Sequence, residues 1–233
     1  MKQVLFYSEE YKDLAARISS LSGIPLGTIS SKRFPDGERY MRIIDSVRDV
    51  DTYLLSSSFD DDNALLTYDL ACGLVENGAK RLSLIMPYFG CATMERAVCS
   101  GEVITAKNRA RLFSSIPQSP FGNRIFTVDL HSEGIPHYFD GETRVFHIYA
   151  KDAIIKAAEE IGGDNFVLAS TDAGRAKWVE SLANDIGVSA SFVYKRRISG
   201  SKTQVSAVSA QVKDKNVIIY DDMIRTGGSL IGA

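Results

Sequence analysis

The sequence lacks a strong net charge and long apolar runs, and each absence excludes a class of protein. Its 233 residues carry 27 basic and 29 acidic side chains, a formal net charge of −2, so no broad basic field favours nucleic acid. The longest apolar runs, such as Leu82–Tyr88, have the length of a strand and are far too short to span a membrane. Residues 1–5 show no long apolar signal segment. We therefore expect neither a nucleic-acid partner nor a membrane partner.

Cysteine is also scarce. The three cysteines, Cys72, Cys91 and Cys99, are odd in number and form no CxxC pair. This usage is typical of buried or free thiols in a reducing compartment, and it predicts a cytoplasmic protein without a disulfide framework.

Apolar, β-branched runs alternate with helical patterns along the chain. Continuous apolar runs are typical of strands buried on both faces, and the alternation predicts an α/β fold with mostly parallel, Rossmann-like sheets. The stretch Ile198–Gln204 is polar and contains a glycine, which predicts a mobile loop. The pattern of strands and helices before Val145 resembles the pattern after it, which favours two domains, 1–145 and 146–233. The expected strands are Val4–Tyr7, Tyr53–Ser56, Leu82–Tyr88, Arg124–Leu130, Phe166–Ala169, Phe192–Tyr194 and Val217–Tyr220, and the expected helices are Tyr11–Leu21, Asn63–Asn77, Thr105–Ser114, Asp152–Ile161 and Arg175–Ile186.

The last predicted strand ends at two adjacent acids, Asp221 and Asp222, and a Thr-Gly-Gly-Ser turn follows at 226–229. Ligands of open α/β sheets bind at the carboxyl ends of the strands. Small residues allow backbone N–H groups to approach a phosphate at a helix N-terminus, while carboxylates accept hydrogen bonds from vicinal hydroxyls. The order of strand, acids and glycines therefore favours a sugar phosphate over an ordinary acidic strand end with a helix cap. The sequence contains neither a GxxxxGK[ST] nor a GxGxxG motif.

An ordered set of motifs carries a family resemblance over the whole chain. The set consists of Lys32–Glu38, Pro87–Gly90, Asp129–His131, Asp172–Gly174 and Lys195–Arg197, followed by the 221–229 stretch. In this order the motifs resemble ribose-phosphate pyrophosphokinase, the phosphoribosyl-pyrophosphate (PRPP) synthetase family. The resemblance implies two phosphoribosyltransferase-like domains, an ATP-side domain followed by a ribose 5-phosphate-side domain. It also implies transfer of the diphosphoryl group of ATP to the 1-hydroxyl of ribose 5-phosphate, which gives PRPP and AMP, with Mg²⁺ as cofactor. The implied assembly is a homo-oligomer built from dimers, of which a hexamer is one form.

The resemblance also implies a role for individual residues. The ribose 5-phosphate loop corresponds to Asp221, Asp222, Arg225, Thr226, Gly227, Gly228 and Ser229. The nucleotide would be bound by Phe34, Asp36, Gly37 and Glu38, in a loop that reaches a neighbouring subunit's site, and by Thr93, Met94 and Arg96. The catalytic residues would be Lys195, Arg197 and His131, and the metal ligands would be Asp129, His131, Asp140 and Asp172.

Each of these assignments has a simpler structural alternative. Phe34–Glu38 taken alone reads as a hairpin turn, because Pro-Asp-Gly is a common turn sequence. Lys195–Arg197 reads as the solvated basic end of a strand, and Asp172 as the N-cap of the following helix. A lone histidine such as His131 is more often structural than catalytic. The ordered set of motifs favours the functional assignments.

The sequence departs from the family pattern at several positions. Thr93 and Met94 replace an arginine and a glutamine that would contact ATP, and Arg225 stands where an aspartate is usual. The sequence also ends four residues after Ser229, so we expect the second domain to be truncated in this chain or to be covered by a partner. The alternatives are a non-catalytic relative that associates with an active synthetase, and a phosphoribosyltransferase, which would need no N-terminal domain of this kind.

Overall fold

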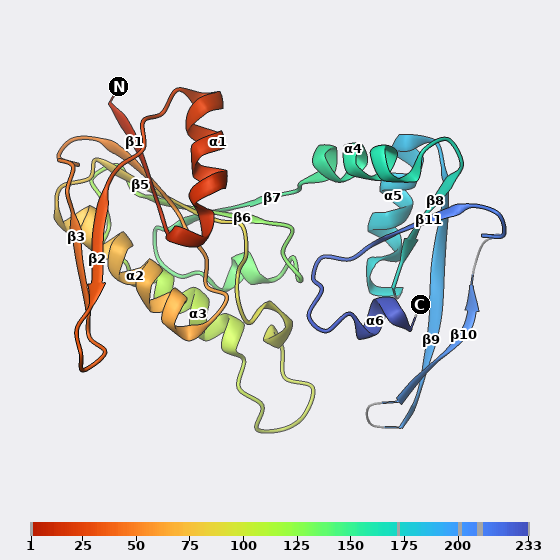
Figure 1. Ribbon diagram of the computed structural model, residues 1–233. Coiled ribbons are helices and arrows are strands. Elements are labelled where there is room, and N and C mark those ends of the chain that lie inside the picture. The colour runs from red at the N-terminus through yellow and green to blue at the C-terminus, as the bar shows by residue number, and fades with distance from the viewer. Residues whose placement is uncertain (1, 172, 200–201, 209–211, 233) are drawn as a thin grey trace. The chain divides into compact units, whose positions relative to one another are not determined.

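The computed structural model describes residues 2–171, 173–199, 202–208 and 212–232, without the side chains of residues 173, 193–199, 202–208 and 229. The chain divides into two compact units, 1–149 and 150–233, which are described separately below (Figure 1). The boundary drawn from the sequence after Val145 falls inside a strand of the first unit, Arg144–Ile148.

The first unit is built on a five-stranded, fully parallel sheet. Its strand order is β1-β4-β5-β6-β7. Because every strand runs the same way, the carboxyl ends of all five strands lie along one edge of the sheet. The strands are β1 (Gln3–Tyr7), β4 (Asp51–Leu55), β5 (Arg81–Met86), β6 (Asn123–Val128) and β7 (Arg144–Ile148).

Helices cover both faces of this sheet. Helices α2 (Asp61–Glu76) and α3 (Thr105–Ser114) pack on the face that carries Phe6, Leu54 and Leu84. Helix α1 (Lys12–Ser22) packs on the opposite face, against Leu5 and Leu55. Successive side chains of a strand point to opposite faces, so adjacent residues such as Leu54 and Leu55 contribute to different cores. Three 3₁₀ turns complete the unit: η1 (Glu9–Tyr11), η2 (Ala92–Met94) and η3 (Ile135–Tyr138).

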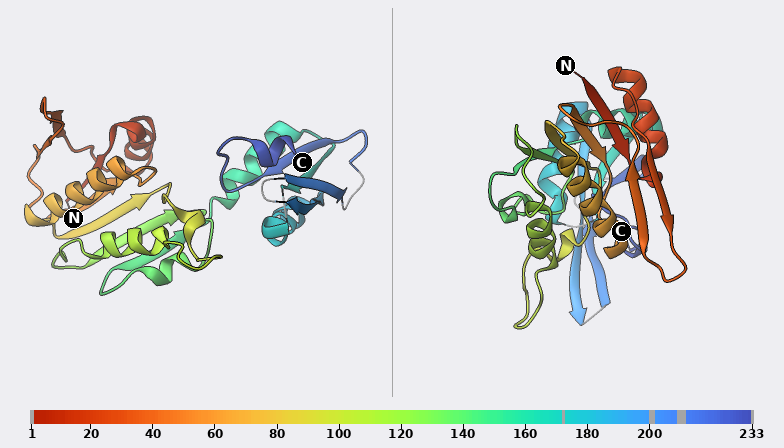
Figure 2. Two further views of the ribbon diagram at one scale, coloured as in Figure 1. Left: turned by 90° about the horizontal axis from the view of Figure 1, so that it is seen from below. Right: turned by 90° about the vertical axis from the view of Figure 1, so that its left-hand side faces the viewer.

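An antiparallel hairpin forms a separate two-stranded sheet beside the main one (Figure 2). It consists of β2 (Ile29–Arg33) and β3 (Arg39–Ile43). The turn is closed by hydrogen bonds from Phe34 N to Glu38 O (2.8 Å) and from Gly37 N to Phe34 O (2.9 Å). Gly37 has a φ of 93°, a conformation that glycine adopts without steric cost. The hairpin turn suggested by Pro-Asp-Gly is therefore confirmed, although the polar strands beside it were not predicted.

The second unit has a four-stranded mixed sheet of order β10-β9-β8-β11. Strand β8 (Phe166–Ser170) pairs in parallel with β9 (Ser189–Ser199) and β11 (Asn216–Tyr220), whereas β10 (Lys202–Val208) is antiparallel to β9. Helices α4 (Lys151–Gly162) and α5 (Ala176–Ile186) pack on the face of the sheet that carries Phe166 and Leu168. The remaining elements are η4 (Ala173–Arg175) and α6 (Gly228–Ile231).

The seven strands and five helices expected from the sequence are all present, and the mostly parallel α/β fold is confirmed. The loop expected at Ile198–Gln204 is wrong in part: Ile198 and Ser199 end β9, and Lys202–Gln204 begin β10. The backbone of this polar segment pairs across an antiparallel hairpin, with Thr203 opposite Arg197, a long-range preference that local composition does not reveal. No helix in the described part of the chain is long and apolar enough to cross a membrane.

Candidate functional site

The carboxyl ends of β8 and β11 carry a network of carboxylates in the second unit. The hydroxyl of Thr171, directly after β8, donates to Asp221 Oδ2 (2.8 Å), and the backbone N–H of Asp222 donates to Asp221 Oδ1 (3.0 Å). Partial burial raises the pKa of Asp221, and the adjacent Asp222 acts in the same direction, while the hydrogen bond from Thr171 opposes both. Asp221 is therefore a half-buried acid held in a fixed orientation.

Its neighbour, Asp222, forms an ion pair with an arginine. Nε of Arg175, at the end of η4, donates to Asp222 Oδ1 (2.9 Å), and only 4% of the Asp222 side chain is exposed. Of the two acids predicted to face sugar hydroxyls, Asp222 thus has a carboxylate that is buried and paired within the protein. Neither Arg175 nor Thr171 was assigned to the site from the sequence. Both residues follow the strand predicted at Phe166–Ala169, but their partners Asp221 and Asp222 become evident only once β8 and β11 lie side by side.

A glycine turn follows these acids and leads into a short helix. Gly227 has a φ of 73°, and the backbone N–H of Gly228 lies 3.4 Å from the hydroxyl oxygen of Thr226. Helix α6 begins at Gly228, so its first N–H groups are at this turn, where an anion is favoured. Arg225 and Thr226 are exposed beside it, and the side chain of Ser229 lies outside the described residues.

In the first unit, a close backbone approach shapes the segment after β5. The N–H of Gly90 donates to Ser58 Oγ (2.9 Å), and a Cβ atom at Gly90 would lie 1.7 Å from the carbonyl oxygen of Ser58. Only glycine fits there, which explains the fourth residue of the Pro-Tyr-Phe-Gly motif. The next residue, Cys91, has a φ of 61° and leads into η2, which contains Thr93 and Met94. Arg96 follows, and its side chain is largely exposed.

Asp129 and His131 follow β6 at the same edge of the sheet. Asp129 has a φ of 41°, a left-handed conformation that is uncommon for a residue other than glycine. Such outliers concentrate at functional sites. Asp140 has different partners: its carboxylate lies 3.4 Å from Arg111, and its N–H donates to the hydroxyl of Ser114 (2.9 Å).

The predicted metal ligands that the structure describes, Asp129, His131 and Asp140, do not form a complete cluster among themselves. Within the described residues, no group of three or more His, Cys, Asp and Glu side chains could hold a metal ion. Asp172, the fourth predicted ligand, lies outside the described residues. Mg²⁺ usually keeps several waters and is held by one or two carboxylates together with substrate phosphates, so the oxygen donors at these strand ends fit such a site only in combination with a phosphate ligand.

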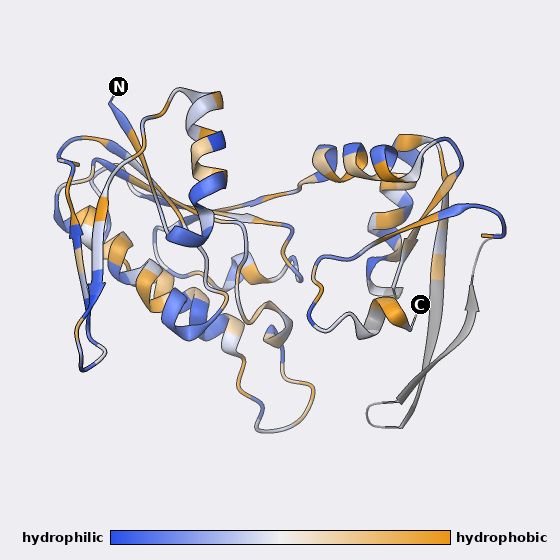
Figure 3. Ribbon diagram, viewed as in Figure 1, coloured by the Kyte–Doolittle hydropathy of each residue, from blue (hydrophilic) through white to orange (hydrophobic). Residues whose placement is uncertain are grey.

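The predicted nucleotide loop, Phe34–Glu38, is the tip of the β2–β3 hairpin. It is exposed along its length, and Figure 3 shows this end of the hairpin as mainly hydrophilic. Asp36 Oδ1 accepts from the N–H of Glu38 (3.1 Å), and Arg33 donates to the carbonyl oxygen of Gly37 (3.0 Å).

One carboxylate of α2 pairs with two arginines of the hairpin. Asp62 Oδ2 accepts from Arg33 and also from Arg39 (2.6 Å). The hydrogen bond from Arg33 is the main cause that lowers the pKa of Asp62. Next to these ion pairs, the Lys32 ammonium lies 5.0 Å from the ring centre of Phe34 and 5.3 Å from that of Tyr40, within cation–π range.

Lys195 and Arg197 lie on β9, opposite Val205 and Thr203 of β10. Their side chains lie outside the described residues. The backbone therefore locates them in a two-stranded extension of the sheet.

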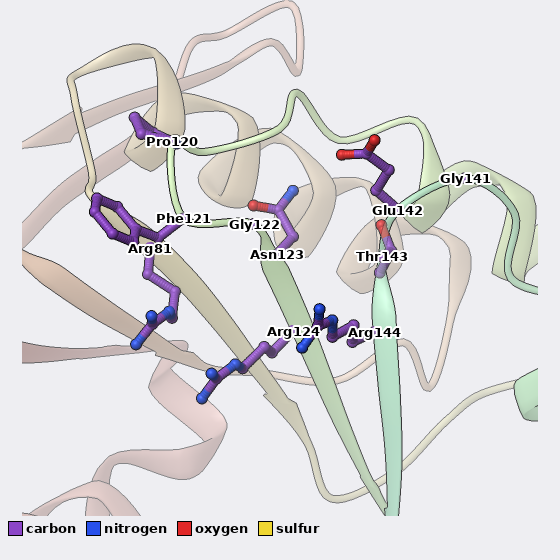
Figure 4. Close-up of a pocket in the computed structure, with 10 residues that line it drawn as sticks. All are labelled: Arg81, Pro120, Phe121, Gly122, Asn123, Arg124, Gly141, Glu142, Thr143 and Arg144. Carbon is purple, nitrogen blue, oxygen red and sulfur yellow. The ribbon is translucent and has the colours of Figure 1, made fainter.

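A cavity of about 780 Å³ lies at the other edge of the first sheet, at the amino ends of β5, β6 and β7. Figure 4 shows Arg81, Arg124 and Arg144, from the three strands, among its lining residues. Arg124 and Arg144 are directly paired across β6 and β7. None of the residues predicted to bind substrate lines this cavity, so it is separate from the candidate site.

Both units of the chain are similar to domains of known proteins. Residues 3–116 match the model of the N-terminal domain of ribose phosphate pyrophosphokinase, and residues 144–233 match that of the phosphoribosyl transferase domain. The ribose-phosphate pyrophosphokinase of Mycoplasma genitalium is 32% identical over 237 residues, an alignment that covers all of this chain and 69% of the relative. The chain belongs to the ribose-phosphate pyrophosphokinase family.

Further relatives agree with this family. The ribose-phosphate pyrophosphokinase of Vibrio parahaemolyticus is 32% identical over 233 residues, covering 98% of this chain and 72% of the relative. The crystal structure of phosphoribosylpyrophosphate synthetase from Mycobacterium smegmatis is similar with a TM-score of 0.85 and 28% identity, covering all of this chain and 75% of the other.

Proposed function

We propose that this protein is a ribose-phosphate diphosphokinase that transfers the diphosphoryl group of ATP to the 1-hydroxyl of ribose 5-phosphate, giving PRPP and AMP. The observation that carries the proposal is the presence of both family domains in one chain. A phosphoribosyltransferase would need only the second domain. A non-catalytic regulatory relative is not favoured, because relatives similar over the whole chain are named as pyrophosphokinases.

In this proposal the ribose 5-phosphate is bound at the carboxyl end of β11. The N–H groups of the turn around Gly227 and Gly228 would bind its phosphate, together with Arg225, Thr226 and Ser229. Asp221, held by the Thr171 hydroxyl, would accept hydrogen bonds from the ribose hydroxyls. Asp222 would act mainly by fixing Arg175 beside the sugar, since its carboxylate is already paired.

The reaction is an attack on the β-phosphorus of ATP by the oxygen of the 1-hydroxyl. A bond forms between that oxygen and the β-phosphorus, the bond from the β-phosphorus to the oxygen bridging to the α-phosphorus breaks, and AMP leaves, while the hydroxyl proton passes to solvent or a base. Negative charge builds on the non-bridging oxygens. Lys195 and Arg197 would stabilise that charge, and His131 would contact the phosphates.

ATP is proposed to bind with Mg²⁺. Asp129 and Asp172 supply the oxygen donors that this ion prefers, with His131 acting on phosphate or bound water and Asp140 a further candidate ligand. When bound, the ion would neutralise phosphate charge. The adenosine is assigned to Phe34, Asp36, Gly37 and Glu38 of the hairpin tip and to Thr93, Met94 and Arg96.

The assembly and the cellular location are further parts of the proposal. An exposed hairpin tip that binds the nucleotide of a neighbouring subunit requires a homo-oligomer based on dimers, and a hexamer is one such assembly. A cytoplasmic location accords with the three free cysteines.

A direct assay tests the proposal. The purified chain is incubated with ATP, Mg²⁺ and ribose 5-phosphate, with the phosphate concentration varied, and AMP and PRPP are measured. We expect both products in equal amounts. A folded protein that forms no AMP above background would refute the synthetase function, and a thermal shift with ribose 5-phosphate but none with ATP would then support the regulatory alternative.

A residue-level test uses Lys195→Ala. We expect kcat to fall far more than the affinity for either substrate, because the lysine would act in the transition state. Lys215→Ala, an exposed lysine ahead of β11, is the matched control and should leave kcat unchanged. An unchanged kcat in Lys195→Ala would remove this residue from the catalytic role.

A further inference from the structure

The loop that carries Asp129 and His131 is fastened to the end of β7 at three points. The N–H of Asp129 donates to the carbonyl oxygen of Ile148 (3.0 Å), and the N–H of Leu130 donates to His147 Nε2 (2.9 Å). The hydroxyl of Tyr149 donates to Glu133 Oε1 (2.9 Å). One of these contacts is made by the side chain of His147, in β7, and one by the side chain of Tyr149, directly after this strand. The rings of His147 and Tyr149 pack together with 4.3 Å between their centres.

This fastening coincides with the strained residue of the loop. Asp129 has a φ of 41°, and a residue other than glycine keeps such a conformation only when its surroundings determine it. The hydrogen bonds made by the N–H groups of Asp129 and Leu130 lie on either side of its φ and ψ bonds. Together they oppose relaxation of the Asp129 backbone toward the ordinary extended region.

The burial of Leu130 makes its hydrogen bond to His147 important for the conformation of the loop. Its side chain belongs to the main core and is only 3% exposed, so its N–H needs a partner within the protein. His147 Nε2 supplies that partner, which means that this nitrogen carries no proton when the hydrogen bond forms. With the Leu130 side chain fixed by the core and its N–H fixed by His147, the side chains of Asp129 and His131 on either side leave the backbone in set directions.

We propose that His147 is a positioning residue: through the Leu130 N–H it holds the strained Asp129–His131 corner in the conformation that presents these side chains to the ATP phosphates. His147 does not contact substrate in this mechanism. The inference rests on the proposed function for its catalytic consequence, whereas its structural part, the restraint of the corner by the imidazole, is independent of that function.

Two variants distinguish the effect of the hydrogen-bond acceptor of His147 from the effect of the volume of its side chain. His147→Phe keeps a ring beside Tyr149 but removes the acceptor, and His147→Gln places an amide oxygen near the former Nε2 position. Exchange of the Leu130 amide hydrogen, measured by NMR in the full chain, should accelerate at least tenfold in His147→Phe and remain slow in His147→Gln. In the PRPP assay we expect kcat to fall by about 10- to 100-fold in His147→Phe. A loss of this size is typical of residues that orient a ligating side chain without contacting the substrate. His147→Gln should recover most of that loss.

The control is Phe146→Leu, on the same strand but the opposite face, where Phe146 stacks on Phe126 with 5.0 Å between ring centres. This variant should lower Tm without changing kcat or the exchange of the Leu130 amide. The KM for ribose 5-phosphate, which is assigned to the second unit, should stay within threefold in all variants.

The outcomes separate the two proposals. Unchanged Leu130 exchange in His147→Phe, or exchange that His147→Gln fails to slow, would overturn the positioning role. An active wild type with an unchanged kcat in His147→Phe would overturn it as well. If the wild type makes no PRPP, the proposed function fails, while the exchange comparison still decides whether His147 holds the corner.

Discussion

Arg175 and Asp222 form a largely buried ion pair, with 2.9 Å between Nε and Oδ1, beside the acid predicted to bind ribose. Replacing one member of a buried ion pair leaves the other charge uncompensated, which destabilises a protein far more than replacing both members does. The pair therefore couples the stability of the second unit to the geometry of its candidate site.

The first prediction tests this coupling. Arg175→Met should lower the free energy of unfolding of the second unit by about 3 kcal/mol, because the Asp222 carboxylate stays buried without its partner. The double variant Arg175→Met/Asp222→Asn should lose less. Urea unfolding can be followed by the fluorescence of Trp178, the single tryptophan, which packs on the core of the second unit. Equal losses in the single and double variants would contradict the pairing.

The second prediction concerns pH. Burial raises the pKa of Asp221 above its ordinary value of 3.8, so the folded state holds the proton more tightly than the unfolded state does. The carboxyl group therefore destabilises the fold progressively as the pH rises from about that ordinary value through the folded pKa. Asp221→Asn should gain stability over the wild type between pH 3 and pH 7, as measured by Trp178 fluorescence. Asp164→Asn, an exposed acid in the same unit, should show no comparable gain.

The third prediction concerns the hairpin that carries the proposed nucleotide loop. Asp62→Asn removes the charge that pairs with both Arg33 and Arg39, so the hairpin loses two ion pairs with α2. We expect a higher KM for ATP with an unchanged KM for ribose 5-phosphate in steady-state assays. The adjacent Asp61→Asn is a matched control, because Asp61 pairs with Arg109 of α3 instead. Equal KM values for ATP in the two variants would argue against a role for these ion pairs.

The fourth prediction compares two glycines of the first unit. Gly90→Ala should destabilise by about 1–3 kcal/mol, since the new methyl group would overlap the backbone of Ser58. Gly73→Ala should instead stabilise by about 0.5–1 kcal/mol, because this position lies inside α2 and its nearest neighbour, Ile43 Cδ1, is 3.5 Å away. Thermal denaturation followed by circular dichroism would measure both changes, and equal signs would refute the reasoning.

The fifth prediction concerns the paired arginines in Figure 4. Like charges directly opposite each other on neighbouring strands are unfavourable, so Arg144→Gln should stabilise the first unit by about 0.2–1 kcal/mol at low salt. The gain should shrink at high salt, because ions screen the repulsion. Denaturation at two salt concentrations measures this difference, and a gain that grows with salt would contradict it.

The sequence predicted β1, β4, β5, β6, β8, β9 and β11 because these strands contain continuous apolar runs. It did not predict β7, at the edge of the first sheet, and it favoured a loop where β10 begins. It did not predict β2 and β3, whose residues Ile29–Arg33 and Arg39–Ile43 are largely polar and gain their order from the hairpin and from α2. Motif order indicated the acids and glycines at 221–229, whereas Thr171 and Arg175 are recognisable only once β8 and β11 lie side by side. His147 carried no local signal, because its partner is the backbone N–H of Leu130, in the loop after β6.

The alternation of faces along β6 also limits how this part of the chain can change in length. Arg124, Phe126 and Val128 face one side of the strand, while Ile125 and Thr127 face the other, and Asp129 follows directly. Inserting or deleting one residue inside β6 would exchange the two sets, bury an arginine in the main core and reverse the direction of every side chain that follows. Variation in length among relatives should therefore accumulate in the connecting loops and be absent from this strand.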